Sequence, residues 1–89
     1  MSLELDPTKP GIYKFVRVNG AYRFCSVMNQ HSDLVATGEE AESAGIVMIF
    51  DTSWRFGDFN YSSTLRVGTD ENDEPALTKI IGKPNVERL

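Results

Sequence analysis

The chain has 89 residues, of which 40% are hydrophobic and 25% charged, so we expect one small folded domain over residues 1–89 and exclude a disordered chain. Thirteen acidic residues against nine scattered basic ones give a net charge of -4, which excludes a broad duplex-DNA surface. A single cysteine, Cys25, and the lack of a secretory signal or long apolar run favour a reducing, cytoplasmic protein outside the membrane.

The segments 12–18 and 21–28 are predicted to form a β-hairpin around Asn19-Gly20. Both are rich in β-branched and aromatic residues, and Asn-Gly favours the positive φ angles of a two-residue turn. Such a turn pairs Val18 with Ala21 and thereby fixes the register of the other pairs. One face of the hairpin then carries Tyr13, Phe15, Arg17, Tyr22 and Phe24. The opposite face is also apolar, so both faces have side chains to bury.

Further short strands are predicted along the rest of the chain. They lie at 34–37, at the apolar run 46–50, within 54–67 with a break at a glycine, and at 76–82. The acidic segment 69–75 is predicted to be a solvated tip that joins the last two strands into an added hairpin. About six short strands in so small a domain favour a closed or nearly closed antiparallel barrel, because closure removes unpaired strand edges.

Three segments follow the order of a known pair of motifs. "NG" at 19–20 and "HSDLV" at 31–35 stand where the first motif has its hairpin turn and its loop, and "GIVMI" at 45–49 matches the start of the second motif. Together they resemble the Sm and Sm-like (LSm) RNA-binding modules. The segment departs from the family at Phe50-Asp51, where Arg-Gly is expected.

The resemblance implies an all-β fold, namely a small, strongly bent antiparallel β-barrel of Sm-like type with an extra C-terminal hairpin. It also implies a homo-oligomeric ring of roughly five to seven copies, held together at the outer face of the strand that carries Val47 and Ile49. Single-stranded RNA, rich in uridine or adenine, is then expected to bind the loop residues Asn29, His31 and Asp33. These residues offer an amide, a ring and a carboxylate to an unstacked base.

The alternative is a structural or assembly protein, for instance a viral one, with the same barrel and no nucleic-acid ligand. On that interpretation the aromatic residues are core or subunit interface, and His31 is a solvated loop residue. The sequence does not indicate an enzyme. The spacing of Cys25 and His31 does not suggest a nucleophilic cysteine with its histidine base. Glu39 and Glu40 have no apolar pocket that would raise the pKa of one of them for acid–base catalysis. The acidic segment 69–75 does not have the glycine at the sixth position and the glutamate at the twelfth position that an EF-hand loop requires. We therefore expect neither a metal nor a cofactor.

Overall fold

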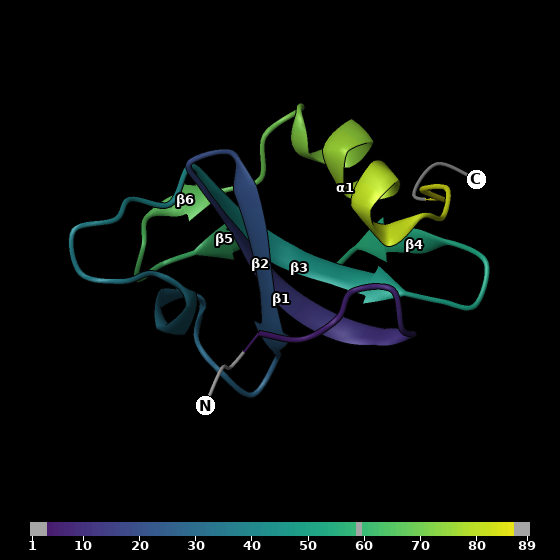
Figure 1. Ribbon diagram of the computed structural model, residues 1–89, viewed down its shortest axis with the longest axis horizontal. Coiled ribbons are helices and arrows are strands. Elements are labelled where there is room, and N and C mark those ends of the chain that lie inside the picture. The colour runs from purple at the N-terminus through teal and green to yellow at the C-terminus, as the bar shows by residue number, and fades with distance from the viewer. Residues whose placement is uncertain (1–3, 59, 87–89) are drawn as a thin grey trace.

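The computed structural model describes residues 4–58 and 60–86. Its centre is an antiparallel four-stranded sheet in the order β2-β1-β3-β4, and a second sheet pairs β5 with β6 (Figure 1). The strands are β1 (Gly11–Val18), β2 (Ala21–Ser26), β3 (Ser43–Ile49), β4 (Trp54–Phe56), β5 (Tyr61–Ser62) and β6 (Val67–Gly68). The regular secondary structure of the described residues is therefore mostly strand, with antiparallel pairing as predicted.

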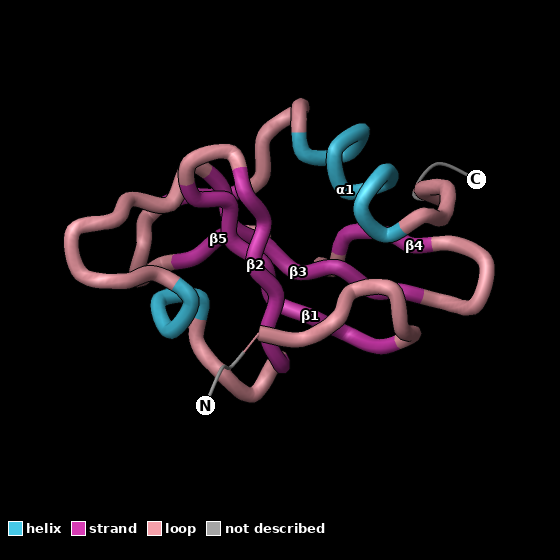
Figure 2. The backbone as a smooth tube through the Cα atoms, viewed as in Figure 1, coloured by secondary structure: helices cyan, strands magenta, loops and turns pink. Residues whose placement is uncertain are grey.

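Two helical segments accompany the sheets, and Figure 2 shows them on opposite sides of the four-stranded sheet. The short 3-10 helix η1 (His31–Leu34) follows the first hairpin, and the α-helix α1 (Asp73–Ile81) lies near β4. Neither these nor any other helix of residues 4–58 and 60–86 has the length and apolar character needed to cross a bilayer.

The hairpin around Asn19-Gly20 has the predicted register. Asn19 and Gly20 have φ angles of 52° and 78°, the positive values that a two-residue hairpin turn requires. Val18 pairs with Ala21, and the register continues to the pair of Phe15 and Phe24. The local turn chemistry was therefore sufficient to place every pair of this ladder.

Each face of the hairpin buries apolar side chains, as predicted, and each contributes to a separate apolar cluster. The first face packs against α1 and contributes to the cluster of Tyr13, Phe15, Phe24, Val47, Ile49, Trp54, Leu77 and Ile81. The second face contributes to the cluster of Val16, Val18, Cys25, Leu34 and Ala44. These two names, first face and second face, are used below for the whole four-stranded sheet.

The predicted strand at 76–82, and with it the extra C-terminal hairpin, is wrong, because this segment lies in α1. Pro75 lies in the first turn of the helix, where a missing N–H is tolerated. Leu77 and Ile81 are four residues apart, so both point to the first face, where they are 0% and 3% exposed. Gly82, with a φ of 78°, ends the helix in the left-handed conformation.

The predicted strand at 34–37 is also wrong. The preceding residues form η1, and Asp33 stabilises its start because its carboxylate accepts a hydrogen bond from the N–H of Gln30 at 2.9 Å. Leu34 turns into the second-face cluster and is 6% exposed. With no strand here, β3 pairs directly with β1 and lies between β1 and β4.

The predicted subunit interface needs a correction as well. Val47 and Ile49 are 0% and 3% exposed and pack in the first-face cluster of their own chain, so they are not free to meet a second copy. The side chains of β3 alternate between faces, which places Ile46 and Met48 on the second face, where both are partly exposed.

Candidate functional site

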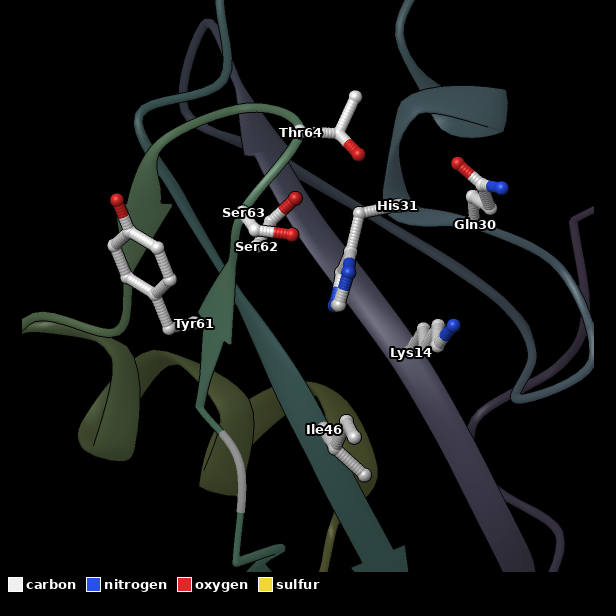
Figure 3. A pocket seen from close by; sticks show the side chains of 8 residues that line it. All are labelled: Lys14, Gln30, His31, Ile46, Tyr61, Ser62, Ser63 and Thr64. Atoms are coloured by element: carbon white, nitrogen blue, oxygen red, sulfur yellow. The ribbon is translucent and has the colours of Figure 1, made fainter.

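A hollow of about 460 Å³ opens on the second face of the sheet, within the size range of small-ligand sites. Figure 3 shows its lining residues, which come from β1, β3, β5, the start of η1 with the residue before it, and the turn that follows β5. They are Lys14, Gln30, His31, Ile46, Tyr61, Ser62, Ser63 and Thr64. This set is called the hollow below.

The floor and one wall of the hollow follow from strand register. Lys14 of β1 lies directly opposite Ile46 of β3, so the two side chains stand next to each other on the second face. Tyr61 of β5 is 57% exposed, and in Figure 3 its ring lies on the side of β5 that faces away from His31. The turn after β5 closes tightly, since the N–H of Leu65 donates to Ser62 Oγ at 3.2 Å.

His31 stands in the middle of the hollow in Figure 3, with the hydroxyl groups of Ser62 and Ser63 on one side and Lys14 on the other. Its side chain is 7% exposed, and Nε2 lies 2.8 Å from the carbonyl oxygen of Gly45. Because a carbonyl oxygen only accepts, Nε2 carries the hydrogen and Nδ1 is left as an acceptor. Burial lowers the pKa of His31 below its ordinary value, so the ring is neutral at pH 7.

Lys14 gives the hollow a positive charge that no neighbouring acid in the lining cancels. Its ammonium group donates to the carbonyl oxygen of Asn29 at 2.6 Å, and among residues 4–58 and 60–86 this is its one hydrogen bond, so two of its three donors are available to a ligand. Two other hollows of the described surface are both lined by Glu39 and Glu40. In a chain of net charge -4, the hollow beside Lys14 is thus the better place for a negatively charged ligand.

The three residues predicted to bind RNA are close in sequence, but only one of them lines the hollow. His31 lines the hollow, but it is buried, which corrects the expectation of a solvated loop histidine. Asn29 contributes its carbonyl oxygen to Lys14, and so orients the cation. Asp33 is exposed and outside the lining, and its carboxylate is engaged with the N–H of Gln30.

Sequence reasoning missed Lys14, Tyr61 and the hydroxyl-rich turn from Ser62 to Thr64. Lys14 alternates with apolar neighbours and has the pattern of an ordinary strand lysine. Tyr61 comes from a distant part of the chain, and only the packing of β5 beside β3 brings it to the hollow. No spacing in the sequence signals this arrangement.

A second polar cluster lies under α1 and is built around Asp73, which is 0% exposed. Its carboxylate accepts hydrogen bonds from Arg17 Nη1 at 2.9 Å, from Ser43 Oγ at 3.0 Å and from the hydroxyl group of Tyr22. The carboxylate also accepts from the N–H of Asp70 at 2.9 Å. These donors lie on β1, β2, β3 and the segment before α1, so the cluster ties the helix to the sheet.

Tyr22 and Arg17, the two donors with shifted pKa values in this cluster, keep their protons near neutral pH. Burial and the hydrogen bond to Asp73 raise the pKa of Tyr22 to about 12, so its hydroxyl group keeps its proton. The hydrogen bond to Asp70 raises the pKa of Arg17 above its ordinary value. A buried carboxylate that accepts this many hydrogen bonds is suited to holding the fold. Within the described residues, no three histidines, cysteines or acids are grouped so that they could hold a metal ion.

Comparison of the chain with protein-family models, with curated proteins and with solved structures finds no match. The geometry of the hollow is therefore the starting point for what the chain does.

Proposed function

We propose that this chain binds single-stranded RNA and that the hollow receives one of its nucleotides. The observation that carries the proposal is the composition of the hollow, which combines the cation of Lys14, the exposed ring of Tyr61 and several hydroxyl groups without an acid. A nucleotide offers matching groups, namely a phosphate for the cation and a flat base for the ring.

The polar atoms of His31 and Gln30 are placed to form hydrogen bonds with the edge of the base. Nδ1 of His31 accepts a hydrogen bond, so it pairs with an N–H donor such as N3–H of uracil or the amino group of adenine. The amide of Gln30 both donates and accepts. In a duplex these base edges are already occupied, and we therefore propose an unpaired uridine or adenosine.

The binding is expected to be weak and only mildly sensitive to salt. Stacking of a base contributes about 1 to 3 kcal/mol, and a single cation contributes a single phosphate contact. The net charge of -4 opposes an RNA strand. One phosphate contact gives a slope of about -0.7 in a plot of log affinity against log salt, far from the steep slopes of basic RNA-binding proteins.

The Sm-like relation, including its bent barrel and its ring, belongs to the same proposal and is supported by two segments. Asn19-Gly20 does form a hairpin turn, and the segment 45–49 does lie in a strand. The two neighbours of β3 are β1 and β4, and Val47 faces the core, so a ring would have to use other residues. Binding of RNA in the hollow does not depend on a ring.

The experiment is fluorescence anisotropy with short labelled oligouridine and oligoadenine at low salt. Tyr61→Ala is expected to weaken binding, while Tyr61→Phe, which keeps the ring, retains it. Lys14→Gln is expected to weaken binding more than Lys79→Gln, which removes the same charge from an exposed site on α1. If neither RNA binds below about 100 µM, equivalent to about 5.5 kcal/mol, an assembly protein without a nucleic-acid ligand replaces this proposal.

A further inference from the structure

A partly exposed row of side chains runs across the second face of the sheet next to the hollow. Ile12, Met48 and Arg55 come from three neighbouring strands, since Ile12 pairs with Met48 and Met48 pairs with Arg55. Ile12 is 50% exposed, the side chain of Arg55 is 43% exposed, and Met48 is partly exposed. Strands lie about 4.8 Å apart, so this row spans roughly 10 Å of open surface.

The row is the next one along the sheet from the floor of the hollow. Lys14 and Ile46 occupy the neighbouring register position, two residues away and therefore about 7 Å along the strands. Gly57 continues that row beyond Ile46, and a Cβ atom at Gly57 would lie only 2.9 Å from Ile46 Cγ2. Gly57 therefore contributes no side chain next to Ile46, and the row lies directly beside the floor of the hollow.

We propose that the RNA strand continues from the hollow onto this row, and that the base next to the bound one stacks on Met48 and the guanidinium plane of Arg55. The inference rests on the proposed function and defines its ligand as two adjacent unpaired nucleotides. Three properties favour RNA as the occupant of the row. The row lies directly beside the floor of the hollow, Lys14 stands where the phosphate between the two bases passes, and a guanidinium plane is a stacking surface for bases.

The contacts of Arg55 decide between a stacking role and a phosphate-binding role. Nη2 lies 3.3 Å from Asp58 Oδ1, and Nε donates to the carbonyl oxygen of Phe56 at 3.1 Å. The carboxylate offsets the charge of Arg55, while the two contacts hold the guanidinium group in place. Arg55 therefore offers its plane to a base, and Lys14 remains the cation for the phosphate.

The test compares the affinities of the 5′-phosphorylated mononucleotide and dinucleotide of uridine, UMP and pUpU, measured by competition against labelled oligouridine. A dinucleotide with the same phosphates but no second base is the control for charge. We expect pUpU to bind about fivefold or more tightly than either of the other two, as one stacked base implies. In Arg55→Lys, which keeps the charge and loses the plane, and in Met48→Thr, this advantage should be lost while the affinity for UMP is kept. Arg66→Lys changes an exposed arginine outside the row and should behave as wild type.

Equal affinity of pUpU and UMP in the wild type, or an advantage that survives both Arg55→Lys and Met48→Thr, overturns the inference and leaves RNA binding in the hollow intact. Sedimentation that shows a wild-type dimer, and a monomer for Met48→Thr, also overturns it, since the row would then be covered by a second copy. If no nucleotide or oligonucleotide binds, the proposed function and this extension both fail. The thermal melting of each variant shows whether its fold is kept.

Discussion

Replacing Asp73 by asparagine is expected to destabilise the fold much more than the same replacement at Asp70, although both carboxylates bind Arg17. The contact with Asp70 is the shorter one, at 2.7 Å against 2.9 Å for Asp73. The two side chains differ in exposure, which is 39% for Asp70 and 0% for Asp73. Burial, rather than contact length, should therefore decide the size of the effect.

The structure sets the magnitude for each replacement. At position 73 asparagine removes the charge that meets Arg17 and places an amide N–H2 near the N–H of Asp70 or the hydroxyl donors. Breaking a buried pair costs about 3 to 5 kcal/mol, and asparagine keeps the shape and one acceptor, so we expect about 3 kcal/mol. At position 70 asparagine keeps an oxygen for the N–H of Asn72, and an exposed ion pair contributes at most about 1 kcal/mol.

Urea unfolding followed by the fluorescence of Trp54 measures both effects. Trp54 is the only tryptophan, is 0% exposed and donates from Nε1 to Thr78 of α1 at 3.2 Å, so it reports on the contact between helix and sheet. A domain of this length has a stability of about 4 to 13 kcal/mol, which makes a loss of 3 kcal/mol easy to detect. Equal losses in the two variants, with unchanged m-values, would refute the claim that the buried carboxylate holds α1 on the sheet.

Two further predictions concern pH and the two faces of β3. Burial lowers the pKa of His31 in the folded chain below its ordinary value. Below about pH 6.5 the unfolded chain therefore takes up a proton that the folded chain does not. The free energy of unfolding should fall as the pH is lowered from about 7.5 to about 5. His31→Gln keeps an N–H for Gly45 but cannot titrate there, and a pH dependence equal to that of the wild type would contradict this assignment. Val47→Lys places an ammonium group in the core and should prevent folding, while Met48→Lys on the second face should fold. Circular dichroism and sedimentation measure the outcome, and a Val47→Lys chain that folds as well as Met48→Lys would contradict the assignment of Val47 to the core.

The first hairpin was predictable because its determinants are local. Asn19-Gly20 specifies a turn, the turn specifies the register, and alternation then assigns each side chain to a face. The predicted interface at Val47 is wrong because it assigns the buried face of β3 to the outside of the molecule. Which face of β3 is inside depends on the position of α1, and the residues of 76–82 predict a strand in place of that helix.

The sequence of α1 contains residues typical of helix ends, but also side chains that favour a strand. Acidic residues and Pro75 in the first turn and Gly82 at the end are typical of a helix, but the isoleucines and threonine of 76–82 favour a strand. Tertiary packing decides the matter, because only the helical spacing brings Leu77 and Ile81 together under Trp54. The acidic run 69–75 predicts a solvated tip, whereas Asp73 is buried because it pairs with Arg17, which is far away in the sequence.

The two faces of the sheet differ in role: the first face stabilises the fold, and the second face carries the proposed ligand site. The first face is closed by α1, whose attachment depends on Trp54 and on the buried carboxylate of Asp73. The second face is covered only in part, which leaves Lys14 and Met48 beside open surface. Substitutions at exposed positions of the second face should therefore change ligand binding with little loss of stability, and substitutions on the first face should do the reverse. This separation makes the proposed RNA site testable, because binding can be removed from a chain that still folds.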